Sequence, residues 1–158
     1  MGPLDSNNFR TARPSDSSAV FRALTEIAPE IPVLLDTAER QRRICDLVDG
    51  CCAGRSSWVS LDDGGSVVGF LLGRTCSTDM PGMEFSGMEL LYGGVLPAHR
   101  CHGRFSKLLA QAKRLRMPLR AVVKHANAGA IAAQLVKGGF LKRGASMRPD
   151  EDTFVWMP

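Results

Sequence analysis

The sequence predicts a mixed α/β domain, in which helices pack against a single sheet. Two observations lead to this prediction: short alternating or apolar runs of strand length, and longer segments whose apolar residues recur at helical spacing. Their order is strand, two helices, three strands, helix, strand, helix and two strands. We therefore expect about six to seven strands and about four helices, which fits one domain of ordinary size.

The expected elements follow from turn and capping residues. Residues 1–8 are expected to be a flexible leader and residues 9–158 a single domain. The expected strands are residues 9–13, 57–61, 66–74, 87–96, 119–123, 140–145 and 153–157. The expected helices follow caps at Asp16 or Ser17, Asp36, Gly103 and Asn127, and the last of them ends at Gly138-Gly139.

Three glycine-containing segments are expected to shape the connections. The sequence Asp62-Asp63-Gly64-Gly65 is typical of a hairpin turn. The paired glycines Gly93-Gly94, inside an expected strand, indicate a bulge or a close approach of another backbone. Residues 75–86, with Pro81 and Gly82, are expected to form a loop.

Composition excludes several classes of protein. Hydrophobic residues make up 44% and charged residues 23% of the 158 residues, as in globular proteins. No apolar run reaches the roughly 18–20 residues of a membrane span. Without a secretory signal, the five cysteines are expected to be reduced thiols in the cytoplasm, and no metal site is expected. The net charge of +4 suits an anionic ligand without requiring nucleic acid.

The most informative segment is residues 95–109, which is predicted to run from a strand through a tight loop into a helix. The first amides of a helix have no partner within it, and the helix dipole adds partial positive charge there. Such a turn binds anions, and Gly103 lets the backbone approach a ligand closely. Arg100, Arg104 and Lys107 add formal charge. An ordinary strand-to-helix turn would explain the same glycine and basic residues.

The pattern Val-x-Pro-x-x-Arg-x-x-Gly-x-Phe-Ser-x-Leu-Leu of residues 95–109 resembles the acetyl-CoA-binding motif of the GNAT superfamily of N-acetyltransferases. Residues 9–16 resemble that family's opening strand, and Asn127 with Gly139-Phe140 resembles a later segment. The element order also matches from Phe9 onward. The resemblance implies a GNAT-like central twisted mixed sheet, with acetyl-CoA as the acyl donor in a cleft where the fourth and fifth strands splay apart.

By resemblance, the amides from Cys101 to Ser106 hold the pyrophosphate, the Val95 backbone bonds the pantetheine arm, and Asn127 lies near the far end of the cofactor. The implied cofactor-binding residues are Val95, Arg100, Cys101, His102, Gly103, Arg104, Phe105, Ser106 and Asn127. Two positions depart from the family pattern. Phe105 stands where a second small residue is usual, and Leu135 stands where the family often has a tyrosine that protonates the leaving thiolate.

Catalysis would require removal of a proton from the acceptor amine, which a carboxylate can perform. Glu89 is the candidate, since many family members carry a glutamate eleven residues before the motif arginine, here Arg100. Glu84 is a weaker rival, and a surface glutamate on an edge strand is the alternative reading of Glu89. Alternation predicts that Tyr92 lies on the opposite face from Glu89, as a core residue rather than an acid.

The sequence therefore predicts an N-acetyltransferase that acts by direct attack of a primary amine, on a small molecule or a peptide. The alternative is a catalytically degenerate CoA-binding module that serves as a sensor or interaction partner. A homodimer is common in the family, and no nucleic acid or membrane partner is expected. The acceptor pocket would be built from the first two helices and the loop of residues 75–86, where basic residues hint at an anionic acceptor or form a solvated face.

Overall fold

The residues that the structure describes form a seven-stranded sheet with the strand order β1-β2-β3-β4-β5-β7-β6. This computed structural model describes residues 8–31, 33–79, 81, 84–127, 131–145 and 148–158, so residues 1–7 of the expected leader lie outside it. The strands are β1 (Phe9–Thr11), β2 (Trp58–Leu61), β3 (Val67–Thr78), β4 (Phe85–Val95), β5 (Leu119–Lys124), β6 (Leu141–Ala145) and β7 (Glu151–Trp156). The helices are α1 (Ser17–Ile27), α2 (Ala38–Ala53), α3 (Arg104–Lys113) and α4 (Ile131–Lys137), with 3₁₀ turns at Pro14–Asp16 and Pro97–His99.

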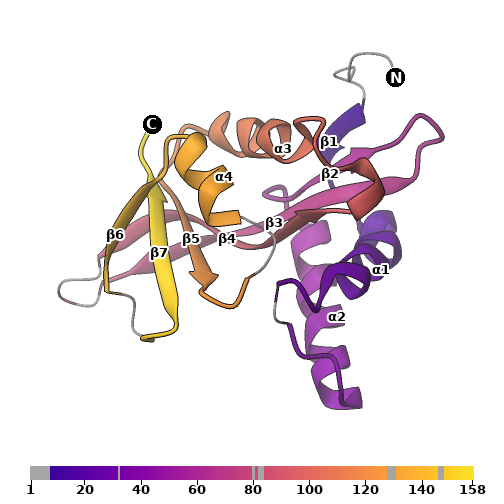
Figure 1. Cartoon of the computed structure of the whole chain (residues 1–158), viewed down its shortest axis with the longest axis horizontal. Helices are drawn as coiled ribbons and strands as arrows, with labels where there is room; N and C mark the ends of the chain where they lie inside the picture. The colour runs from indigo at the N-terminus through magenta and orange to yellow at the C-terminus, as the bar shows by residue number, and fades with distance from the viewer. Residues whose placement is uncertain (1–7, 32, 80, 82–83, 128–130, 146–147) are drawn as a thin grey trace.

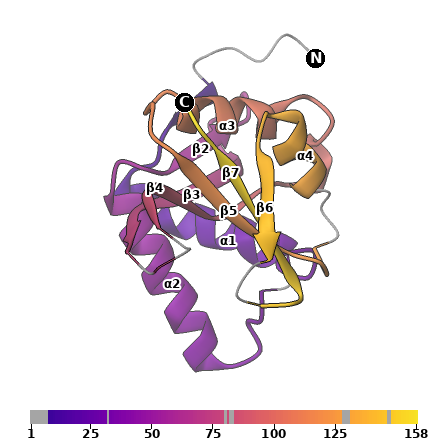
Figure 2. The same ribbon diagram turned by 90° about the vertical axis from the view of Figure 1, so that its left-hand side faces the viewer.

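Neighbouring strands are antiparallel except for β4 and β5, which pair in parallel. A parallel pair needs a crossover connection, and α3 supplies it here. Figures 1 and 2 show α1 and α2 on one face of the sheet and α3 and α4 on the other. The expected mixed α/β sandwich of one sheet between helices is confirmed.

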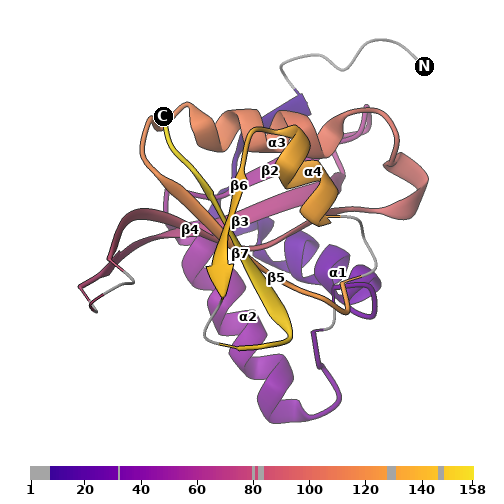
Figure 3. The ribbon, with the colours of Figure 1, turned by 60° about the vertical axis from the view of Figure 1, so that its left-hand side comes forward.

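Each face of the sheet has its own hydrophobic core. Leu108 and Leu109 of α3 pack with Leu71 and Leu90 of the sheet on one face. On the other face, Leu24 of α1 and the α2 residues Val48 and Cys52 pack with strand residues such as Phe70 and Leu72. Figure 3 shows the same two layers from a third direction, with β6 and β7 at the end of the sheet beyond β5. Among the described helices, none combines the length and the apolar character that crossing a bilayer requires.

The hairpin of β3 and β4 is longer than the sequence predicts. Pairing continues to Thr78 opposite Phe85, so much of the expected loop of residues 75–86 is strand. Residues 80, 82 and 83 of that loop lie outside the described part. The predicted turn at residues 62–65 is confirmed, because Gly65 has φ +82° and its N–H donates to the Asp62 carbonyl at 3.0 Å.

Two helix caps differ from the prediction. The Thr37 hydroxyl, not Asp36, caps α2 by accepting a hydrogen bond from the Arg40 N–H at 3.1 Å. The Asp16 carboxylate bonds no amide of α1 and instead accepts from the Arg13 N–H at 2.7 Å. It also forms a two-point pair with the Arg10 guanidinium, which holds the pKa of Asp16 below its ordinary value. Residues 128–130, at the expected start of the last helix, lie outside the described part.

The irregularity in β4 lies at Leu91, not at Gly93-Gly94. Tyr92 pairs with Leu72 while Leu90 pairs with Gly73, which leaves Leu91 as the extra residue of a bulge. The two glycines are regularly paired and allow close approach instead. A Cβ on Gly94 would meet Cδ1 of Ile27 at 2.3 Å, so α1 packs directly on the strand backbone there.

Candidate functional site

The parallel strands β4 and β5 separate halfway along their length. They pair only at Met88, Glu89 and Leu90, although β4 continues to Val95 and β5 to Lys124. The separation begins at the bulge of Leu91, where one extra residue ends the regular ladder. The expected splay of these strands is confirmed, and it leaves backbone groups of β4 turned toward an opening.

The loop after β4 turns the chain so that the amino end of α3 faces this opening. Cys101 has φ +67° and Gly103 has φ +74°, and left-handed residues of this kind turn successive N–H groups into one concave surface. Gly103 is the N-cap of α3 and supplies no side-chain acceptor. The helix bonds begin with Lys107 N–H donating to the Gly103 carbonyl at 3.1 Å. The amides of Arg104, Phe105 and Ser106 therefore have no acceptor within the helix.

A cavity of about 210 Å³ lies at this amino end. It extends between the end of α1, the last residues of β4 and the start of α3. Its lining includes Ile27, Glu30, Gly93, Gly94, Val95, Arg100, Cys101, Gly103, Arg104, Phe105, Ser106, Ile131 and Gln134. A Cβ on Gly103 would meet no atom within 4 Å, so the space in front of this turn is open. Backbone amides arranged in this way are able to bind an anion.

The two motif arginines line this cavity, but the protein itself binds much of each guanidinium group. Arg100 Nε donates to the Val95 carbonyl at 2.8 Å, and its terminal nitrogens bond both carboxylate oxygens of Glu30. Arg104 is 5% exposed and donates to the Ser60 hydroxyl at 2.8 Å and the Leu61 carbonyl at 3.0 Å. Arg100 thus ties the loop to the end of α1, and Arg104 anchors α3 on β2.

The other expected cofactor-binding residues fall into three groups. Cys101, Phe105 and Ser106 line the smaller cavity, whereas the exposed His102 lines none of the cavities described here. Val95 also lines the smaller cavity. The next residue, Leu96, donates its N–H to β3, so strand alternation directs the Val95 N–H to the opposite side of β4. On that side β5 is no longer paired with β4. Asn127 lines a second, larger cavity.

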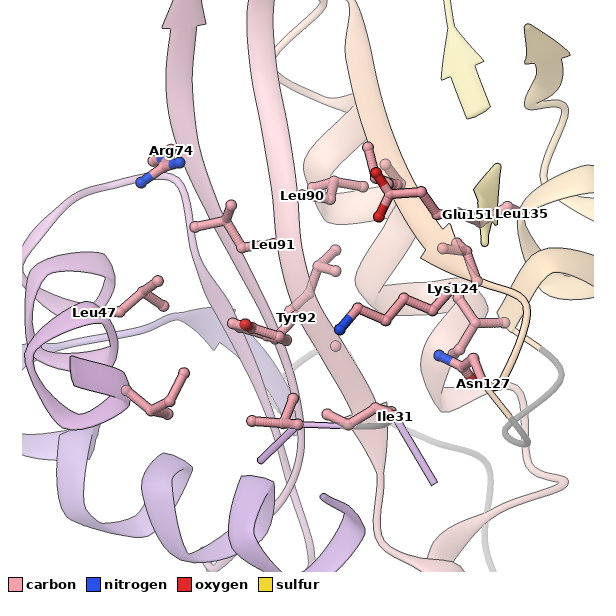
Figure 4. A pocket seen from close by; sticks show the side chains of 18 of the residues that line it. Ile31, Leu47, Arg74, Leu90, Leu91, Tyr92, Lys124, Asn127, Leu135 and Glu151 are labelled. Carbon is pink, nitrogen blue, oxygen red and sulfur yellow. The ribbon is translucent and has the colours of Figure 1, made fainter. Parts of the chain in front are cut away.

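The larger cavity, of about 530 Å³, continues from the splay to the helices on the other face. Phe105 and Gly93 line both cavities, so the two adjoin. In Figure 4, Leu47 and Arg74 lie on one side, Lys124, Asn127 and Glu151 on the other, and Tyr92 between them. The remaining lining is mostly apolar and includes Ile31, Val33, Leu34, Ile44 and Leu91.

Comparison with known proteins identifies the fold. No protein-family model matches the sequence, and no curated protein matches it either. A GNAT-family acetyltransferase from Streptococcus agalactiae matches the structure with a TM-score of 0.73 at 14% identity, covering 95% of this chain and 94% of the other. Arabidopsis thaliana NAA60 in complex with acetyl-CoA gives 0.65 at 18% identity over 95% and 98%. Diaminobutyrate acetyltransferase EctA from Paenibacillus lautus gives 0.62 at 14% identity over 93% and 92%.

The chain has the GNAT fold. Within this fold, Glu89 lies on β4 just before the splay, between two arginines. Its Oε2 is 3.7 Å from a terminal nitrogen of Arg74 on β3 and 3.7 Å from one of Arg120 on β5. The Glu89 side chain is 19% exposed and does not line either cavity, although its partner Arg74 lines the larger one.

The prediction that Tyr92 lies on the opposite face from Glu89 is wrong. Glu89 pairs with Arg74 and Tyr92 pairs with Leu72, and these two β3 residues are two positions apart, on one face. The bulge at Leu91 inserts one extra residue, which brings Tyr92 to the same face of the sheet as Glu89. Alternation along the sequence could not reveal this. Tyr92 packs against the core beneath α1 and α2 and also lines the larger cavity, where burial raises the pKa of its hydroxyl.

At the position where a GNAT tyrosine is usual, Leu135 is 1% exposed within the core beneath α3 and α4. It supplies no proton donor. Sequence reasoning also missed Glu30, Arg74 and Lys124, which line the cavities without belonging to any motif. Only Arg74 carried a signal, because its place on the strand that pairs with β4 follows from the hairpin at residues 62–65.

Proposed function

We propose that this chain is an N-acetyltransferase that moves the acetyl group of acetyl-CoA to a primary amine by direct attack. The single observation that carries the proposal is the uncapped amino end of α3, where Cys101 and Gly103 adopt left-handed backbone conformations beside an open cavity. Backbone amides with this arrangement suit a diphosphate, which carries several acceptor oxygens and negative charge.

The remaining geometry agrees with a donor that lies along the splay. The N–H of Val95 faces the gap between β4 and β5, where an extended amide-containing arm can pair with a strand edge. The smaller and larger cavities adjoin at Phe105 and Gly93, so a donor bound at the turn reaches the larger one. Proteins with the same fold support this reading: Arabidopsis NAA60 was crystallised with acetyl-CoA, and EctA with coenzyme A and its substrate, L-2,4-diaminobutyric acid.

Glu89 is the proposed base. An alkyl ammonium group has a pKa of about 10.4, so only about one amine in a few thousand is neutral at pH 7. The Glu89 carboxylate, acting directly or through a water, takes the proton as the nitrogen attacks the thioester carbonyl. The acetyl group passes to the amine, the C–S bond breaks, and the thiolate takes up a proton. Arg74 and Arg120 hold the carboxylate in place from both neighbouring strands.

The test is thiol release from acetyl-CoA over amino acids, polyamines, aminoglycosides and peptides, with Glu89→Gln and its control Glu84→Gln. Since a positioned base contributes about 10²–10⁴-fold, we expect Glu89→Gln to lower kcat by at least about 100-fold with little change in acetyl-CoA affinity. Glu84→Gln, in the loop before β4, should keep full activity. Full activity of Glu89→Gln would remove this residue from the mechanism.

A CoA-binding module without chemistry is the second candidate. Two observations favour it: Leu135 occupies the position of the usual acid, and Glu89 is paired with two arginines rather than facing a cavity. Thermal stabilisation by acetyl-CoA without thiol release from any amine of the panel would select this candidate. Absence of stabilisation by acetyl-CoA or CoA would reject both candidates.

A further inference from the structure

The larger cavity is lined by four basic side chains and one acidic side chain among the residues described. The basic ones are Arg40 and Arg43 of α2, Arg74 of β3 and Lys124 of β5, and the acidic one is Glu151 of β7. They lie on the face of the sheet that α1 and α2 cover, away from the amino end of α3. These charges therefore belong to the acceptor side of the site rather than to the diphosphate side.

The four basic groups surround the cavity instead of forming one outer surface. Figure 4 shows Arg74 on the side of α2 and the Lys124 side chain pointing from β5 toward Tyr92, so cationic groups stand on opposite sides. Glu151 lies on the β5 side, across the cavity from Arg74. A ligand between β3 and β5 meets a positive group on each side.

Two of these cations are incompletely neutralised. Arg40 pairs with Asp36, just before α2, and Arg43 pairs with Glu39 within that helix, at 2.5 and 2.7 Å. By contrast, Arg74 shares the single carboxylate of Glu89 with Arg120, at 3.7 Å each. Among the described residues, Lys124 has no ion pair within 4.0 Å, although Glu151 lies directly opposite it in the pairing of β5 with β7.

The pair of Arg74 is also weak, because the Arg74 side chain is 59% exposed and exposed ion pairs contribute little. Its guanidinium can exchange partners at small cost. Arg74 nevertheless lies beside the Glu89 carboxylate, so Lys124 is the group best placed to bind an anion remote from Glu89. In Figure 4, Leu91 and Tyr92 lie between Arg74 and Lys124, and this largely apolar surface suits an aliphatic segment.

We propose that the acceptor is an amine that carries a carboxylate or phosphate at a distance from its nitrogen, and that Lys124 holds this anionic group. This inference rests on the proposed acetyl transfer and narrows its substrate class. Charge-assisted hydrogen bonds to such a group fix the far end of the acceptor, so the amine end lies toward β4 and Glu89. The cations of the cavity lower the pKa of a nearby ammonium group and disfavour acceptors with a second positive charge.

The test uses amines that differ only at the far end. One set is ε-aminocaproate, its amide and hexamethylenediamine; the other is γ-aminobutyrate, its amide and putrescine. Aminohexyl phosphate distinguishes phosphate from carboxylate. We expect kcat/KM for the anionic member of at least one set to exceed that of its amide by about tenfold or more, and the diamine to be the poorest substrate.

Variants with matched controls locate the effect. Lys124→Met should lower kcat/KM for the preferred anionic amine by about tenfold and change that of the amide by less than about twofold. Lys137→Met, which removes an exposed lysine of α4 outside both cavities, should change neither.

Binding decides the proposal even if turnover is too slow to measure. Calorimetry with the CoA-saturated protein should give tighter binding of the anionic probes than of their amides, and Lys124→Met should remove the difference. The proposal would be overturned if amides or diamines bound as tightly as the anionic probes, or more tightly. It would also be overturned if Lys124→Met weakened the binding of charged and neutral probes equally. Such a result leaves acetyl transfer itself intact, whereas failure to bind acetyl-CoA rejects the proposed function instead.

Discussion

The two ends of the opening between β4 and β5 are built from different parts of the chain. At the α3 end, backbone amides face the cavity and the motif arginines point elsewhere, Arg100 to Glu30 and Arg104 to Ser60. At the α2 end, side chains from several helices and strands face the cavity, among them Arg74 and Lys124. A site made of backbone amides requires only one local turn, whereas a site made of side chains requires several segments, distant in the sequence, to be correctly placed in the fold.

This difference explains why one end carries a motif. The α3 end depends on a left-handed glycine and a helix start within one short stretch, so residue types at fixed spacing reveal it. At the α2 end no single position requires one particular residue type, because many side chains can present a charge or an apolar surface. Substitutions should therefore act differently at the two ends.

The largest expected effect is at Gly103. A valine there must adopt φ +74° and extends a branched side chain into the open space before the amides. Each lost charge-assisted bond is worth about 1.5–3 kcal/mol, so we expect acetyl-CoA affinity to fall by about 100-fold, measured by calorimetry.

The control for Gly103→Val is Gly65→Val, in the hairpin turn far from the cavity. Gly65 has φ +82°, and a Cβ there meets nothing within 4 Å, so the conformational strain of about 1–2 kcal/mol is matched. The control should lose stability but keep affinity. If both variants bind acetyl-CoA as the wild type does, the backbone cradle is not the binding site.

A smaller effect, on stability rather than binding, is expected at Arg104. Its removal in Arg104→Met leaves the buried Ser60 hydroxyl and the Leu61 carbonyl without this donor. We expect the free energy of unfolding to fall by about 1–3 kcal/mol, measured by denaturant titration, with acetyl-CoA affinity within about twofold of wild type. Arg114→Met, an exposed change at the other end of α3, is the control. A large loss of affinity at unchanged stability would make Arg104 a phosphate ligand.

The smallest effect is expected at the pair of Glu30 and Arg100, which ties the loop before α3 to the segment after α1. The hydrogen bonds from Arg100 hold the pKa of Glu30 below its ordinary value of about 4.3, so the pair contributes fully above that value and is lost as pH falls through the lower folded-state pKa. Glu30→Gln should reduce acetyl-CoA affinity about threefold at pH 7.

The pH dependence separates this pair from other causes. Thermal unfolding of the wild type should show a loss of stability below about pH 4 that is smaller in Glu30→Gln, because the variant lacks the titrating group. Glu26→Gln, an exposed change on α1, should follow the wild type. Identical acid profiles for all three proteins would mean that the pair contributes nothing measurable.

The sequence by itself determined the element order, the hairpin at residues 62–65 and the turn at Gly103, because these follow from local backbone preferences and the period of apolar residues. Tertiary structure decided where side chains point. The bulge at Leu91 put Glu89 and Tyr92 on one face, and packing of α3 against β2 directed a terminal nitrogen of Arg104 to Ser60.

The same distinction holds for the charges of the larger cavity. Arg43, Arg74 and Lys124 lie far apart in the sequence and face one space only because β3, β5 and α2 meet around the splay. Strand pairing and helix packing set that meeting, and they depend on contacts between distant residues that no local pattern encodes. The turn at Gly103 can therefore be predicted from the sequence, but the pocket proposed to select the amine cannot.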